Sequence, residues 1–247
     1  MIIIIKLLIA HLIGDFLLQP RIWVDEKENK KIKSKKLYLH LLIHGILVLL
    51  LLWQIDYWPL ALMLVLAHGI IDIIKLYLQQ KDKKVTWFFI DQGLHVVSIF
   101  TFWKIWVYPN LDLSLLPLSN SFYVYVIAII FLTVVSGVII RILMANWSDS
   151  LNDSHDESLN NAGKYIGMLE RLFVFTFVIT GNWEAIGFLL AAKSVFRFGD
   201  LKESKDRKLT EYILIGTLLS FGLAIATGLL INELLKCAQF GAQLKLN

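Results

Sequence analysis

Histidines and aspartates recur at four-residue spacing within the first 100 residues of this 247-residue chain. Side chains four residues apart lie on one face of an α-helix, about one turn from each other. Four successive segments would therefore each present two polar groups on a single stripe. The pairs are His11 and Asp15, His40 and His44, His68 and Asp72, and Asp91 and His95.

Imidazole and carboxylate groups together are typical ligands of transition metals. Zinc, manganese, iron and nickel accept both, whereas calcium and magnesium prefer oxygen alone. The single cysteine, Cys237, excludes an internal disulfide and a thiolate zinc site. We therefore predict a divalent transition metal cofactor (zinc, manganese or iron) held by these eight side chains, with Asp15, Asp72 and Asp91 as candidate catalytic groups. Eight ligands suffice for two ions, or for one ion with further groups that orient its ligands.

The segments that carry these pairs are unusually apolar. The chain is 57% hydrophobic and 18% charged, and its mean hydropathy is +0.66, whereas soluble domains have roughly 45–50% apolar and about 25% charged residues. Only helices can satisfy their backbone groups inside lipid without closing into a barrel. The composition predicts an all-α, polytopic membrane protein whose direct partner is the lipid bilayer.

Eight stretches are long and apolar enough to be membrane-spanning candidates. The sixth and seventh are short, so they form either two short spans or a re-entrant hairpin. The eight candidates are Ile2–Gln19, Leu37–Trp53, Trp58–Leu78, Trp87–Tyr108, Phe122–Met144, Tyr165–Thr180, Glu184–Phe198 and Glu211–Leu235.

Loop charges predict the orientation. Lysine and arginine concentrate in the first, third and seventh loops, whereas Gln54–Tyr57 and Pro109–Ser121 contain neither. Because basic loops stay on the cytoplasmic side, we expect a multi-pass protein of the inner (cytoplasmic) membrane with both termini outside. The same loops account for the net charge of +4, and no basic stripe with exposed aromatics predicts nucleic-acid binding.

The orientation places all four polar pairs within two or three turns of the cytoplasmic surface. An ionisable group near the centre of a membrane helix costs at least about 2.5 kcal/mol, so these groups need partners. Gln19 and Gln92 lie beside the stripe and are predicted to orient ligands or substrate. Lys75 is expected to extend to the membrane surface or to attract an anionic group. Four glycines next to the ligand candidates are expected to let the helices approach closely; they are Gly14, Gly45, Gly69 and Gly93.

Other interpretations of the pairs remain open. A single His–Asp pair in a membrane is often a structural hydrogen bond between helices. Facing histidines could ligate haem, although haem chemistry does not call for three aspartates at one level. Chains of aspartate and histidine also build proton or ion relays.

The second half of the chain, residues 111–247, differs from the first. It contains Glu170, Arg171, Lys193 and Arg197 inside or near predicted spans. These charges either pair with one another, for example Glu170 with Arg197, or form a basic site for a phosphate or carboxylate. In the second case Arg171, Lys193 and Arg197 are predicted substrate-binding residues. We treat residues 1–110 and 111–247 as two four-helix segments.

The motifs "HLIGDFLLQ", "HLLIHG", "HGIIDIIK" and "IDQGLH" resemble a bacterial membrane family catalogued as domain of unknown function 3307. The resemblance covers roughly residues 3–110. It implies membership of that family and a shared set of polar positions, and it implies no reaction. Those positions are His11, Asp15, Gln19, His40, His44, His68, Asp72, Asp91, Gln92 and His95.

Two classes of function fit these observations. A metal-dependent membrane hydrolase would use a metal-bound water as nucleophile, with an anionic lipid or phosphate-bearing substrate. A metal-ion or proton transporter would use the cluster as a transit site, and would need polar groups that continue to the outer face. The outer halves of these spans are almost purely apolar, which favours the enzyme or a metal-sensing module. A structural partner subunit is the third alternative.

Overall fold

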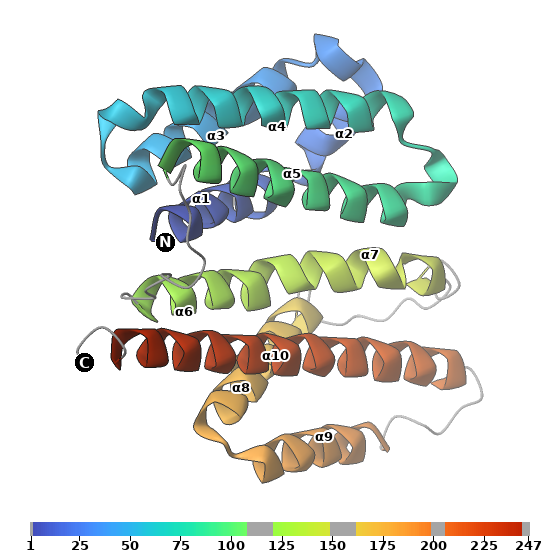
Figure 1. Ribbon diagram of the computed structural model, residues 1–247. Helices are drawn as coiled ribbons and strands as arrows, with labels where there is room; N and C mark the ends of the chain where they lie inside the picture. The colour runs from blue at the N-terminus through green and yellow to red at the C-terminus, as the bar shows by residue number, and fades with distance from the viewer. Residues whose placement is uncertain (1, 108–120, 149–161, 199–205, 244–247) are drawn as a thin grey trace. The chain divides into compact units, whose positions relative to one another are not determined.

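The computed structural model describes residues 2–107, 121–148, 162–198 and 206–243, and all regular structure within these ranges is helical (Figure 1). Contacts within the chain divide it into two compact units, one of residues Met1–Ile127 with Ala238–Asn247 and the other of Ala128–Cys237. The boundary predicted after residue 110 lies outside the described residues and stays a prediction.

The first unit is built on four long helical segments. Helix α4 packs against α3 and α5, and α1 packs against both α3 and α5 (Figure 1). The elements in chain order are α1 (Ile2–Leu12), the π-helical turn η1 (Ile13–Leu17), α2 (Arg21–Lys30), η2 (Lys31–Lys33), α3 (Lys35–Leu52), η3 (Ile55–Tyr57), α4 (Trp58–Leu78), η4 (Lys81–Lys83) and α5 (Lys84–Val107).

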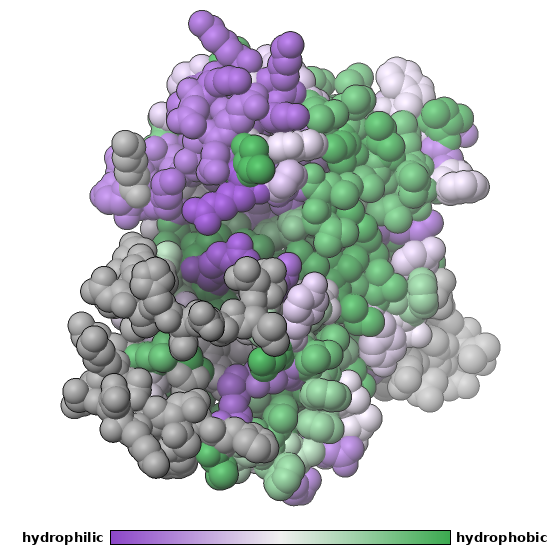
Figure 2. All heavy atoms as spheres, turned by 180° about the vertical axis from the view of Figure 1, so that it is seen from behind, coloured by the Kyte–Doolittle hydropathy of each residue, from purple (hydrophilic) through white to green (hydrophobic). Residues whose placement is uncertain are grey.

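This unit buries a group of polar side chains and exposes many large apolar ones. On α3, His40 and His44 are buried, while Leu42, Ile46 and Leu50 are more than half exposed. Figure 2 shows hydrophobic side chains along the flank of this unit and hydrophilic ones gathered at one end. Such a distribution is the one that a lipid environment stabilises.

Among the described residues, five helices are long and apolar enough to cross a membrane, or six if the bent pair Ile2–Leu17 and Arg21–Lys33 counts as one span. Helix α9 (Trp183–Phe198) has 16 residues, shorter than the roughly 20 that a span needs. Helix α8 (Ala162–Thr180) buries Glu170 and Arg171. The finding therefore supports several membrane helices, and the count of eight remains a prediction.

The first predicted span differs from the structure in two ways. Its α-helix changes into the π-helical turn η1 after Leu12. The helical structure then ends before Pro20, because proline disfavours the helical conformation in the residue before it. The chain then bends by 84°. The charged stretch that the sequence suggested as a loop forms the helix α2, which packs against α3.

The hydrophobic core of the first unit lies to one side of the histidines along the helices. Its residues precede His11 on α1 and His68 on α4, and follow His44 on α3 and His95 on α5. The core consists of Ile4, Leu7, Ala10, Val48, Leu52, Leu60, Ala61, Leu64, Ile99 and Trp103.

In the second unit, Arg171 crosses from α8 to a neighbouring helix. Its Nε donates a hydrogen bond to the carbonyl of Leu132, inside the π-helical turn η6 (Phe131–Val135). The acceptor is thus a backbone carbonyl of an irregular turn, of the kind often found at functional sites. Gly181, with φ of 76°, reverses the chain between α8 and α9. The remaining elements are α6 (Ser121–Ile130), α7 (Ser136–Ser148) and α10 (Asp206–Gln243).

Candidate metal centre

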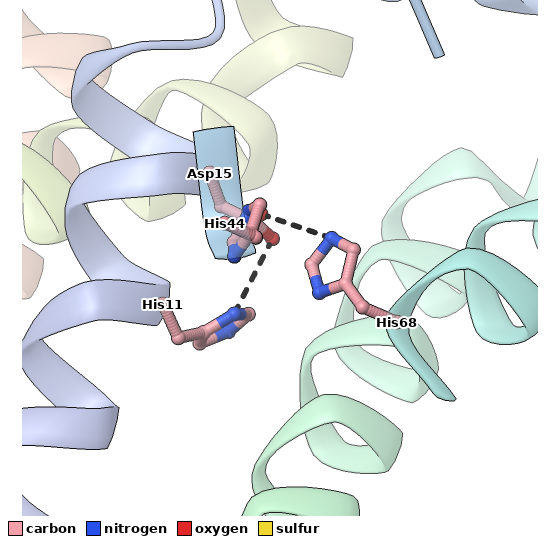
Figure 3. Close-up of side chains that lie close together, drawn as sticks. All are labelled: His11, Asp15, His44 and His68. Atoms are coloured by element: carbon pink, nitrogen blue, oxygen red, sulfur yellow. Dashed lines mark hydrogen bonds and ion pairs between the residues drawn. The ribbon is translucent and has the colours of Figure 1, made fainter. Parts of the chain in front are cut away.

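All eight predicted ligands converge on one buried region of the first unit. Figure 3 shows His11 and Asp15, from the first helical segment, and His44 directed toward His68 on α4. Three groups have potential ligand atoms within 4.8 Å of one another, and together they include all eight residues. The groups are His11, Asp15, His44 and His68; His40, His68 and Asp72; and Asp15, Asp91 and His95.

Three of these atoms form a nearly equilateral triangle. His40 Nε2 lies 3.1 Å from His68 Nε2, and Asp15 Oδ1 lies 3.3 Å from the first and 3.4 Å from the second. In a tetrahedral zinc site with metal–ligand distances of about 2.0–2.1 Å, neighbouring ligand atoms are roughly 3.3 Å apart. The triangle therefore has the dimensions of one face of a zinc coordination tetrahedron.

Two further histidines lie next to this triangle. His44 Nε2 is 2.9 Å from Asp15 Oδ1, so His44 can supply a fourth ligand. His11 Nδ1 is 3.9 Å from Asp15 Oδ2, and its Nε2 is 3.2 Å from the amide oxygen of Gln92. A hydrogen bond on the other ring nitrogen fixes the orientation of a ligating imidazole. Gln92 therefore positions His11 within the centre.

Each carboxylate uses its two oxygens differently. The closest contacts of Oδ1 are to imidazoles: His44 for Asp15, and His95 for both Asp72, at 3.6 Å, and Asp91, at 3.4 Å. The Oδ2 atoms instead accept hydrogen bonds from an outer layer of donors. Gln92 Nε2 donates to Asp15 at 2.9 Å, Lys27 Nζ to Asp72 at 2.8 Å, and Lys75 Nζ to Asp91 at 2.8 Å. One oxygen of each carboxylate is thus directed to the centre and the other is fixed from outside.

Sequence analysis did not identify Lys27 as part of the site. The residue lies on α2, is 5% exposed, and reaches Asp72 across 45 residues of sequence. Trp23 and Lys27 are four residues apart on the less exposed face of α2, and Lys31 follows four residues later in η2; that spacing was the available signal. Lys75 was expected to extend to the membrane surface or to attract an anionic group; its ammonium pairs with Asp91 Oδ2 at 2.8 Å.

Several polar atoms in the centre are buried without a hydrogen-bond partner. They are His11 Nδ1, His40 Nδ1, Asp91 Oδ1 and both ring nitrogens of His95. Buried polar atoms are almost always satisfied in native proteins, and exceptions point to an ion or water. A cavity of about 20 Å³, lined by His11, His44, His68 and His95 among others, adjoins these rings. These observations show that the donor set suits a metal ion.

The glycines beside the ligands do not all have the expected role. A Cβ atom at Gly14 would lie 2.4 Å from His44 Nε2, and one at Gly69 would lie 3.0 Å from Leu41, so both positions require a close approach. A Cβ atom at Gly45 would lie 3.2 Å from the side chain of Val65. Gly93 is exposed and has nothing within 4 Å, so the expectation of close packing is wrong there.

The predicted substrate-binding residues lie in several environments. The amide nitrogen of Gln19 is buried without a partner, while Gln92 is engaged within the centre. In the second unit Lys193 Nζ lies 2.6 Å from Glu170 Oε2, an ion pair that differs from the Glu170–Arg197 example. Arg171 donates to Leu132 and to Ser220 Oγ. The side chain of Arg197 lies outside the described residues.

A family model described as "Protein of unknown function (DUF3307)" matches residues 3–122. Those residues belong to the DUF3307 family. The match includes every side chain of the centre just described, so the centre is a feature of the DUF3307 region. Searches of curated proteins and of solved structures found no match.

Proposed function

We propose that the DUF3307 region holds a divalent transition metal at the cytoplasmic side of the inner membrane, and that the protein is a hydrolase acting on an anionic, membrane-associated substrate. The observation that carries the metal assignment is the triangle of His40 Nε2, His68 Nε2 and Asp15 Oδ1, with His44 beside it. Three imidazoles and one carboxylate suit zinc, manganese or iron.

The number of polar groups supports catalysis beyond metal storage. A structural metal needs about four ligands, and this centre has four further ionisable side chains. A divalent metal lowers the pKa of a bound water and so supplies a hydrolytic nucleophile near neutral pH. His95 Nε2 lies 3.4 Å from Asp91 Oδ1 and 3.6 Å from Asp72 Oδ1, so this imidazole is placed to hold a proton beside the two carboxylates and to donate it to a leaving group.

The surroundings of the centre differ between its two ends. At the basic end lies the unpartnered amide nitrogen of Gln19, which suits an anionic group. On the other side, the buried cluster that includes Leu7, Leu64 and Trp103 is wholly apolar. A transported ion would have to cross this cluster without ligands, at high cost. This arrangement favours the hydrolase over the transporter.

Metal content tests the first part of the proposal. Protein purified without chelators, dialysed against zinc and then washed should retain about one zinc per chain by elemental analysis. His68→Ala and His40→Ala should lose most of it. Thr101→Ala is the control, because this exposed hydroxyl only donates to its own helix at Val97. Near-zero zinc in the wild type, or equal content in all four proteins, would disprove the metal centre.

Hydrolysis needs its own assay. Metal-loaded protein is incubated with phosphatidic acid in detergent micelles and, separately, with a soluble aryl phosphate, and released phosphate is measured. We expect release from the lipid, and His95→Ala should retain zinc while losing activity. Metal-loaded protein that releases no phosphate from either would overturn the phosphate-ester hydrolase and leave the metal centre standing.

A further inference from the structure

Helix α2 lies over the basic end of the metal centre. It follows the first helical segment after a bend of 84°, and its buried Lys27 donates from Nζ to Asp72 Oδ2 at 2.8 Å. The apolar cluster that includes Leu7, Leu64 and Trp103 lies at the opposite end. None of the eight ligand side chains is more than 9% exposed. A substrate larger than a water molecule therefore reaches them only if a surrounding element moves.

Helix α2 and the turn η2 are held on α4 and α5 by polar contacts. Lys31 Nζ donates a hydrogen bond to the carbonyl of Leu76. Glu28 accepts one from Gln79 Nε2 at 3.2 Å and one from Lys84 Nζ at 3.1 Å. In the described part of this unit, no residue of α2 belongs to the hydrophobic core. Segments with few buried apolar contacts are the ones that open locally, so α2 can separate from α4 and α5 while the core stays packed.

The backbone at the two ends of α2 suits a hinged element. Pro20 precedes the helix at the point where the chain bends. Lys31 follows it with φ of 52° and ψ of −133°, a conformation that residues other than glycine rarely adopt and that persists only where contacts enforce it. The hydrogen bond from Lys31 to Leu76 is such a contact. Its loss should both free α2 and relieve the backbone strain.

We propose that α2 is a lid over the metal centre, hinged at Pro20 and Lys31, whose opening admits metal and substrate. This inference rests on the proposed metal centre and adds the control of access to it. Lys27 connects the lid to the centre through Asp72 Oδ2. The contacts of Lys31 and Glu28 involve none of the ligand side chains, so they set how often the lid opens without altering the ligands.

Cysteine labelling tests the lid in metal-free protein. Ser34 is fully buried and its hydroxyl lies 3.1 Å from Glu26 of α2, so Ser34→Cys reports on opening. In the purified Cys237→Ser protein this thiol should react slowly with a maleimide. Lys31→Met should increase the rate about tenfold, the effect of one charge-assisted hydrogen bond. Lys33→Met is the matched control, because it removes an equal charge from an exposed side chain beside the thiol and should not increase the rate.

Zinc exchange connects the lid to the centre. In zinc-loaded protein without the added cysteine, Lys31→Met should speed release to a chelator by the same factor. The zinc affinity should stay unchanged, because a lid contact alters entry and exit equally. Lys33→Met should change neither quantity. If Lys31→Met does not fold, Glu28→Ala replaces it. This variant loses the contacts with Gln79 and Lys84 and should increase labelling and release by about two- to fivefold.

The outcomes separate the lid from the metal centre. Equal labelling in folded Lys31→Met and Lys33→Met proteins shows that α2 does not open, which overturns the lid and leaves the metal centre standing. Faster labelling with unchanged zinc release shows that α2 opens without controlling access, which also overturns the proposal. A wild type that binds no zinc removes the metal centre and the access role together, whatever the labelling shows.

Discussion

Replacement of Gly14 by alanine should weaken metal binding without unfolding the protein. Gly14 lies in the π-helical turn that carries Asp15, directly against the ring of His44. A Cβ atom there would be 2.4 Å from His44 Nε2 and 2.5 Å from Cε1, and ordinary contact begins at 3.4 Å. The imidazole must therefore move by about 1 Å, whereas metal sites tolerate about 0.2 Å.

The loss of zinc affinity can be estimated from the displacement of the His44 imidazole. Losing the orientation of one ligand typically reduces metal affinity by about 10–100-fold, equivalent to about 1.4–2.7 kcal/mol. Folding should be maintained, because alanine is favoured over glycine in helices by up to about 1 kcal/mol. Zinc affinity is measured by chelator competition in detergent, and folding by thermal melting.

Gly93→Ala is the matched control. This glycine also lies in a helix and beside a ligand candidate, Asp91, but it is exposed and has open space around it. It should gain the same helical preference and keep the wild-type zinc affinity. If Gly14→Ala binds zinc as tightly as Gly93→Ala does, His44 is not a ligand and the assigned coordination is wrong.

Two further predictions concern the second unit and the orientation. Lys193→Met leaves Glu170, which is 9% exposed, without its partner, and should destabilise the protein by about 1–3 kcal/mol in thermal melts. Lys236→Met is the control, because it removes a lysine from an exposed pair with Glu233 and should change the melting temperature little. Equal shifts in the two variants would argue against a structural role for the buried pair. In a Cys237→Ser background, Asn29→Cys should react with an impermeant maleimide only from the cytoplasmic side and Asp56→Cys only from outside; the opposite pattern would invert the topology.

The sequence predicted best those helices that are apolar along their whole length. The span Trp58–Leu78 agrees with α4 at both ends, because apolar residues continue to the tryptophan at one end and to the glutamines at the other. Helix α2 was not predicted, because its dense charges are typical of a loop in a membrane protein. Tertiary contacts stabilise it, such as Lys27 with Asp72 and, in the following turn η2, Lys31 with the carbonyl of Leu76, and no local pattern encodes these contacts.

The sequence predicted the pairs of polar side chains on each helix, but not the contacts between pairs on different helices. Four-residue spacing placed His68 and Asp72 on one helical face, and both are buried in the centre. Which atom meets which depends on how the helices pack and on the π-turn that directs Asp15 inward. The inward reach of Lys75 depends on the approach of α5, which brings Asp91 within 2.8 Å.

X-ray absorption at the zinc edge of the zinc-loaded wild type tests the central claim most directly. We predict a five-coordinate shell of nitrogen and oxygen at about 2.0–2.2 Å, from three imidazoles, the Asp15 carboxylate and one bound water, with the outer-shell scattering of about three imidazoles. His40→Ala should lower the imidazole scattering or abolish zinc binding. A six-coordinate oxygen shell, or a spectrum without imidazole scattering, would contradict the assignment of His40, His44, His68 and Asp15 as the ligands.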